Sequence, residues 1–63
     1  MDAHRSQLSS AATTLEELTA RITALADEYR GSEREDVTLD LDEVERSLRT
    51  AVRRLQRLVR RMD

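Results

Sequence analysis

The chain contains no cysteine and no proline, and it has one glycine, Gly31, and one histidine, His4. The lack of cysteine excludes disulfides and thiolate metal sites, and a single histidine excludes a histidine-based zinc site within one chain. A chain of 63 residues forms one domain at most, over residues 1–63, and buries a small core. We therefore expect association with another chain to supply part of its stability.

Aromatic residues are almost absent, since Tyr29 stands alone and there is no Phe or Trp. Strands favour aromatic and β-branched residues separated by turn residues, so this composition, with 38 % charged residues, predicts an all-α fold. Lysine is also absent, and the eleven arginines are typical of a GC-rich bacterial genome. We see no signal peptide and no apolar run of membrane-spanning length, so we expect a cytoplasmic protein.

The first half of the chain repeats apolar residues every seven positions. When heptad positions are lettered a to g from Met1, the a and d positions hold Met1, His4, Leu8, Ala11, Leu15, Leu18, Ile22, Leu25 and Tyr29. This unbroken spacing predicts a helix over about residues 2–30 with one face against a partner helix. Gly31 is expected to end the helix, because glycine adopts the left-handed conformation at little cost.

Residues 31–40 are polar and acidic, and they predict a loop between two helices. Val37, Leu39 and Leu41 alternate with polar residues, which is the period of a strand. We expect a short extended piece that covers the open end of the core. Asp40 is predicted to cap a second helix over about residues 41–62, with Glu43 completing a capping box.

The second helix carries a broader apolar stripe than the first. With a new heptad starting at Leu41, its a and d positions are Leu41, Val44, Leu48, Ala51, Leu55, Leu58 and Met62, and Val52 and Val59 add the e position. Three apolar positions in seven suit a helix with more than one neighbour. We predict an antiparallel two-helix hairpin that pairs into a homodimeric four-helix bundle. A monomeric hairpin that docks on helices of a different protein is the alternative.

The predicted oligomer interface follows from these stripes. A single hairpin is expected to leave Val52 and Val59 half exposed, and a second hairpin would cover them. The interface residues are predicted to be Leu8, Leu15, Leu18, Ile22, Leu25, Leu48, Val52, Leu55 and Val59.

Charge is distributed unevenly along the chain. Residues 27–45 hold nine acids and two arginines, whereas residues 46–63 hold seven arginines and one acid. In a hairpin the loop end is then acidic and the end with both termini is basic. The candidate contacts for phosphate or an acidic protein surface are Arg49, Arg53, Arg54, Arg57, Arg60 and Arg61.

Two structural explanations of these arginines stay open beside the functional one. Cations near the C-terminus of a helix complement its dipole, and arginine stems cover the edges of an apolar core. The arginines are also suited to pair with the acidic loop end of a second copy in a head-to-tail dimer.

No residue pattern indicates catalysis, and we expect no enzyme activity, no cofactor, no metal and no small-molecule substrate. The unbroken heptads predict a small protein-interaction module, a dimeric helical adaptor or regulator, for example in transcription control. One alternative is nucleic-acid or anionic-ligand binding through the arginines, although the net charge of −2 and the single aromatic residue disfavour nucleic acid. Another is an antitoxin-like or chaperone-like subunit of a hetero-oligomer. Membrane binding is disfavoured, because the stripe has the regularity of a protein contact.

Overall fold

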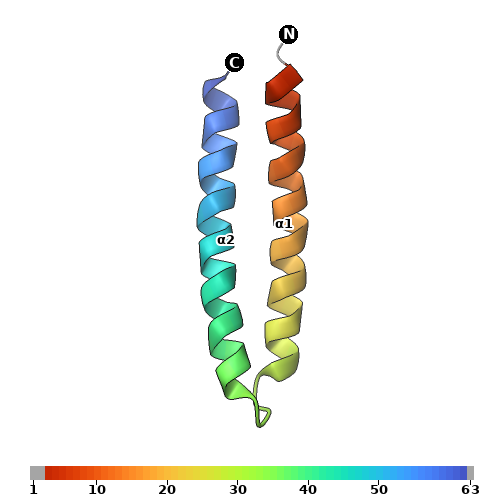
Figure 1. The fold of residues 1–63 in the computed structure, drawn as a ribbon, viewed down its shortest axis with the longest axis vertical. Coiled ribbons are helices and arrows are strands. Elements are labelled where there is room, and N and C mark those ends of the chain that lie inside the picture. The colour runs from red at the N-terminus through yellow and green to blue at the C-terminus, as the bar shows by residue number, and fades with distance from the viewer. Residues whose placement is uncertain (1–2, 63) are drawn as a thin grey trace.

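Two antiparallel helices form the structure, a computed structural model that describes residues 3–62 (Figure 1). Helix α1 spans Ala3–Tyr29 and helix α2 spans Glu35–Arg61, and the two pack side by side along a rod 51 Å long. The predicted all-α hairpin is therefore confirmed. The first turn of α1 and the last turn of α2 lie at the same end of the rod, opposite the turn between the helices. Met1, the first predicted heptad position, lies outside the described residues.

The turn between the helices is short and closed by its own side chains. Gly31 has a φ of +80°, so α1 ends with the left-handed residue that the sequence predicts. The Ser32 hydroxyl donates to the Tyr29 carbonyl at 2.6 Å and accepts from the Arg34 amide at 3.1 Å. A carboxylate oxygen of Glu35 accepts from the Gly31 amide at 2.5 Å. These bonds satisfy backbone groups that the helix ends leave open.

Helix α2 begins six residues earlier than the sequence predicts, and this corrects the expected acidic loop over residues 31–40. Val37 continues the helical spacing of the α2 stripe toward its N-terminus, and Thr38 is buried between the helices. Leu39, which we expected to cover the core, is 64 % exposed. The capping role of Asp40 is also wrong, since Asp40 lies inside the helix. Burial at a helical period overrides the alternating pattern, because five residues suffice to reverse the chain.

The core lies in a seam between the helices that is built mainly from small side chains. Among the described residues, those buried are Ala12, Thr19 and Ala26 of α1 and Thr38, Val52 and Val59 of α2. All six occupy e positions, at multiples of seven residues within each helix. Small side chains on α1 let α2 approach closely, so that its valines fill the space between the helices.

This seam corrects the expectation for Val52 and Val59. They are 7 % and 9 % exposed within the single hairpin, so they need no second copy to cover them. The sequence shows that the α2 stripe is three positions wide. Which of those positions face α1 depends on the small residues with which α1 meets them.

Thr38 supplies a first prediction about stability. Thr38 is 1 % exposed, and its buried hydroxyl has no hydrogen-bond partner among residues 3–62. Thr38→Val keeps the shape of the side chain and removes a desolvated hydroxyl, so we expect it to raise the free energy of unfolding by about 1–2 kcal/mol. Urea denaturation measures the change, with Thr13→Val as the control at an exposed helical site. A less stable Thr38→Val protein would contradict the prediction.

A candidate interaction surface on one face of the hairpin

The two sides of the hairpin differ because of the way its heptads pack. The seam uses the e positions and part of the a positions, so the b positions lie on one flank and the d positions on the other. The b positions join the helices through polar pairs. Gln56 donates to Glu16, and Arg30 contacts Asp42 at 3.3 Å.

At the middle of this polar flank, Glu45 connects both helices. One of its carboxylate oxygens accepts from the Thr23 hydroxyl at 2.8 Å, and the other pairs with Arg49 at 3.1 Å. The Glu45 side chain is 19 % exposed, so these two contacts compensate a carboxylate that has lost much of its hydration. This side of the hairpin is therefore covered by paired polar groups, and we call it the polar face.

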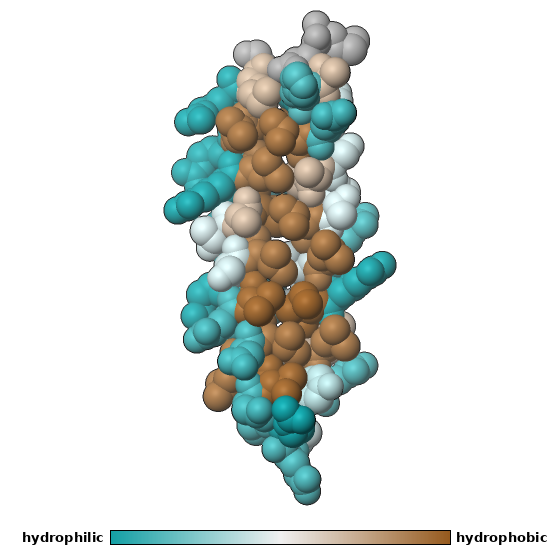
Figure 2. Space-filling view, in the orientation of Figure 1, coloured by the Kyte–Doolittle hydropathy of each residue, from teal (hydrophilic) through white to brown (hydrophobic). Residues whose placement is uncertain are grey.

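The opposite flank carries apolar side chains along both helices. We define the apolar face by the six d-position residues along the middle of the rod, Ala11, Leu18, Leu25, Val44, Ala51 and Leu58. The four large ones are substantially exposed, at 41 % for Leu18, 45 % for Leu25, 44 % for Val44 and 37 % for Leu58. Figure 2 shows a continuous hydrophobic surface that follows both helices, with hydrophilic side chains at its margins.

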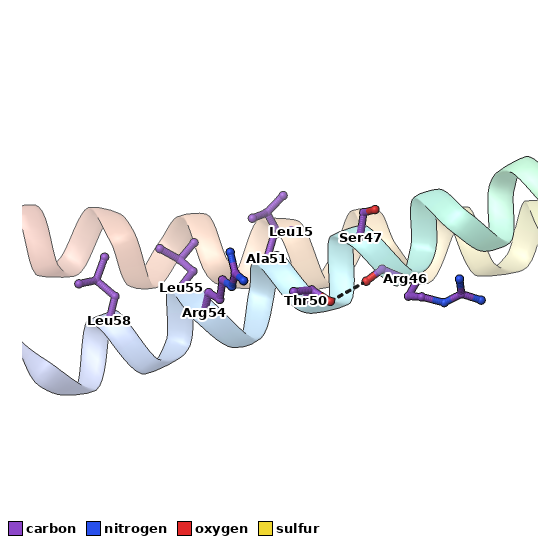
Figure 3. A pocket seen from close by; sticks show the side chains of 8 residues that line it. All are labelled: Leu15, Arg46, Ser47, Thr50, Ala51, Arg54, Leu55 and Leu58. Carbon is purple, nitrogen blue, oxygen red and sulfur yellow. Dashed lines mark hydrogen bonds between the residues drawn. The ribbon is translucent and has the colours of Figure 1, made fainter.

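The apolar face is hollowed near the middle of the rod. A shallow groove is lined by Leu15 of α1 and Ala51, Leu55 and Leu58 of α2, with the polar side chains of Arg46, Ser47, Thr50 and Arg54 along one side (Figure 3). In that view the three leucines point to the same side of the hairpin. A second groove, along α2 toward the loop end, is lined by Val44, Leu48 and Ala51 among others. Ala51 belongs to both grooves because its methyl group leaves room between the larger side chains on either side.

The predicted interface residues fall into three groups in the structure. Leu18 and Leu25 lie exposed on the apolar face, while Val52 and Val59 are buried in the seam. The others, half buried at the a positions between face and seam, are Leu8, Leu15, Ile22, Leu48 and Leu55. The predicted set omits four d-position residues of the face, Ala11, Val44, Ala51 and Leu58. Their signal was present in the heptad, but we assigned the wider stripe of α2 to its e position.

The six candidate arginines do not form one patch. Arg49 lies on the polar face against Glu45, and Arg54 and Arg61 hold g positions at the edge of the apolar face. Arg53 and Arg60 hold f positions and Arg57 holds a c position. Arg53 lines a groove with Glu16 of α1 on the polar face, whereas Arg57 lines a hollow with Arg54 and Arg61. Apart from Arg49, none of the six pairs with a carboxylate of residues 3–62.

The loop end concentrates negative charge, and its few cations are already paired. Arg34 contacts Asp36 at 3.2 Å, and the hydrogen bond that it donates lowers the pKa of the Asp36 carboxyl. Arg30 lies 3.3 Å from both Asp27 and Asp42. The other acids of this half of the rod and the exposed arginines of the other half place negative and positive charge at opposite ends of the hairpin.

The comparisons with known proteins supply no further assignment. No family model, no curated protein and no solved structure matches this chain. Residues 3–62 bring together no group of three or more His, Cys, Asp or Glu side chains that could hold a metal ion. Neither α1 nor α2, as described, has an apolar stretch long enough to cross a membrane.

Proposed function

We propose that this chain is a small non-enzymatic protein-interaction module that dimerises through its apolar face into a four-helix bundle and acts as an adaptor or regulator. The observation that carries the proposal is the contrast between the two faces. The polar face is joined across the helices by paired side chains, whereas the apolar face exposes Leu18, Leu25, Val44 and Leu58 without any charged residue among the d positions. An extended, exposed apolar surface marks a contact with a partner.

The small core of the hairpin supports the same proposal. The buried apolar residues of the described chain are two alanines, Ala12 and Ala26, and two valines, Val52 and Val59. Chains of this size need additional stabilisation, and this one has no cysteine for disulfides. Complete burial of a leucine side chain contributes about 1.5–3 kcal/mol relative to full exposure. Covering the apolar face in both copies therefore adds substantially to the stability.

A second copy of the chain suits this surface because the hairpin carries complementary charges at its two ends. The loop end is acidic and the opposite end is basic, so two copies can oppose unlike charges beside their apolar contact. The bundle would keep Arg53, Arg57 and Arg60 on its outer surface. In the adaptor role, these side chains would contact an acidic surface of a further protein.

The oligomeric state tests the proposal directly. Light scattering or sedimentation equilibrium is expected to give twice the chain mass of 7.3 kDa at micromolar concentration. The melting temperature is expected to rise with protein concentration, because dissociation accompanies unfolding. A well-folded monomer would overturn the proposal. A monomer that is poorly folded alone would favour the hetero-oligomer alternative, in which a different protein covers the apolar face.

Binding of an anionic ligand or nucleic acid is the second candidate function, favoured by the arginines that no carboxylate of residues 3–62 pairs with. It predicts that affinity for single- or double-stranded DNA or RNA falls steeply with salt concentration. The double variant Arg53→Glu and Arg57→Glu separates the two functions. If the chain acts only through protein contacts, nucleic-acid binding is absent from the outset, and the variant still dimerises. Salt-sensitive binding that the variant abolishes would support this second function.

A further inference from the structure

We infer that the second copy packs with its loop at the opposite end of the bundle, so that α2 lies against α2 and α1 against α1. The inference rests on the proposed dimer and adds the orientation and register of its two copies. Two hairpins stacked face to face have two symmetric arrangements. In one, both loops lie at the same end and α1 faces α2 of the other copy. In the other, the loops lie at opposite ends and each helix faces its own counterpart.

The polar pairs across the hairpin establish which residues lie at the same height. Residue 16 contacts residue 56, residue 23 contacts residue 45, and residue 30 contacts residue 42. Leu18 is therefore about level with Ala51, near the middle of the rod. A two-fold axis at that height brings Leu18 against its counterpart and Ala51 against its counterpart.

The other four residues of the apolar face also pair in this register. Seven residues before and after Leu18 are Ala11 and Leu25, and seven residues before and after Ala51 are Val44 and Leu58. The same axis therefore places Ala11 opposite Leu25 of the second copy, and Val44 opposite Leu58 of the second copy. With both loops together, Ala11 lies opposite Leu58, Leu18 opposite Ala51 and Leu25 opposite Val44 of the other copy. The middle level then holds two leucines and two alanines in either arrangement, so side-chain size does not choose between the two.

The charges beside the apolar face distinguish the two arrangements. The g positions along its margins are Gln7, Thr14, Arg21 and Glu28 on α1 and Asp40, Ser47, Arg54 and Arg61 on α2. With the loops together, each Glu28 lies opposite Asp40 of the other copy, and no oppositely charged pair compensates. With the loops apart, each Asp40 lies opposite Arg61 of the other copy, and no like charges meet. Each contact occurs twice by symmetry, so the loops-apart arrangement is favoured at both ends of the bundle.

Disulfide cross-linking tests the orientation without background, because the chain contains no cysteine. With the loops apart, the two Ala51 residues lie across the two-fold axis on adjacent helices. Ala51→Cys is then expected to form a covalent dimer under mild oxidation, since a disulfide requires closely spaced Cα atoms. Ala20→Cys is the matched control, because Ala20 is exposed at an f position away from the face. It should remain a single chain on a denaturing gel.

The opposite orientation predicts a different cross-link. With the loops together, Ala51 lies against Leu18 of the other copy and diagonally across the bundle from the second Ala51. Ala51→Cys alone then stays uncross-linked, and a covalent dimer forms only when it is refolded together with Leu18→Cys. That result would overturn the inferred orientation and leave the proposed dimer intact. A chain that light scattering shows to be a folded monomer would overturn the dimer as well.

A distance measurement decides the orientation if neither disulfide forms. Glu33 lies exposed in the turn, so Glu33→Cys accepts a spin label at the loop end of each copy. With the loops apart, the two labels are separated by roughly the rod length of 51 Å. A short separation, about the width of a bundle, would overturn the inference.

Discussion

Leu18→Glu is expected to dissociate the dimer and unfold the chain, whereas Leu39→Glu should leave both properties unchanged. Leu18 lies at the centre of the apolar face, where the dimer would bury it, and a buried unpaired carboxylate costs far more than the lost leucine contact. The dimer buries only the 41 % of Leu18 that the single hairpin leaves exposed, so the lost burial amounts to about 1 kcal/mol per copy, and the buried carboxylate adds its larger cost in each copy. Since the dimer contains two copies, we expect its dissociation constant to rise by at least about 100-fold.

Leu39 is a matched control for this substitution. It is the same residue type on a helix, and at 64 % exposure it projects away from both the seam and the apolar face. Sedimentation equilibrium measures the association, and circular dichroism measures the helix content. A hairpin that is stable alone would tolerate Leu18→Glu about as well as Leu39→Glu, because Leu18 is already 41 % exposed in it. Equal behaviour of the two variants would therefore contradict the proposed interface.

Ala26→Leu is expected to destabilise the protein by about 1–3 kcal/mol through overpacking of the seam. Ala26 is 1 % exposed and lies where the helices approach closely, so a larger side chain must push them apart. Urea denaturation measures the loss as a lower midpoint.

Ala20→Leu provides the control for the seam substitution. Ala20 is exposed on the same helix, and alanine and leucine have similar helix propensities. We expect Ala20→Leu to change the midpoint little. Equal stability of the two leucine variants would show that the seam has room at Ala26 and that the helices are not held together by close packing there.

Local signals in the sequence were sufficient for the outline of the hairpin. The heptad over residues 1–29 predicted α1, and Gly31 predicted its end. The helix and its end both depend on contacts and backbone preferences within a few residues. Helix α2 was predicted with its start six residues late. The alternation of Val37, Leu39 and Leu41 fits a strand as well as a helix over so short a stretch, and only packing against α1 decides between them.

The assignment of faces depended on the tertiary structure. The apolar stripes gave three candidate positions, a, d and e, for the contact between the helices. Because Ala12, Thr19 and Ala26 are small, the hairpin closes on its e positions and leaves the d positions exposed. The arginines show the same division. The sequence placed them outside the stripe, while the packing decided that Arg49 and Arg53 lie on the polar face and that Arg54 and Arg61 lie beside the apolar face.

The sequence by itself thus determined two amphipathic helices, the turn that reverses the chain and the segregation of charge between the two ends. These features follow from periodicity and composition, which are local. Tertiary structure alone decided that Val52 and Val59 belong to the seam and that Leu18, Leu25, Val44 and Leu58 form an open face. The reason is physical: the rotation of one helix against another is set by the sizes of side chains that meet across the seam, and these come from distant parts of the chain.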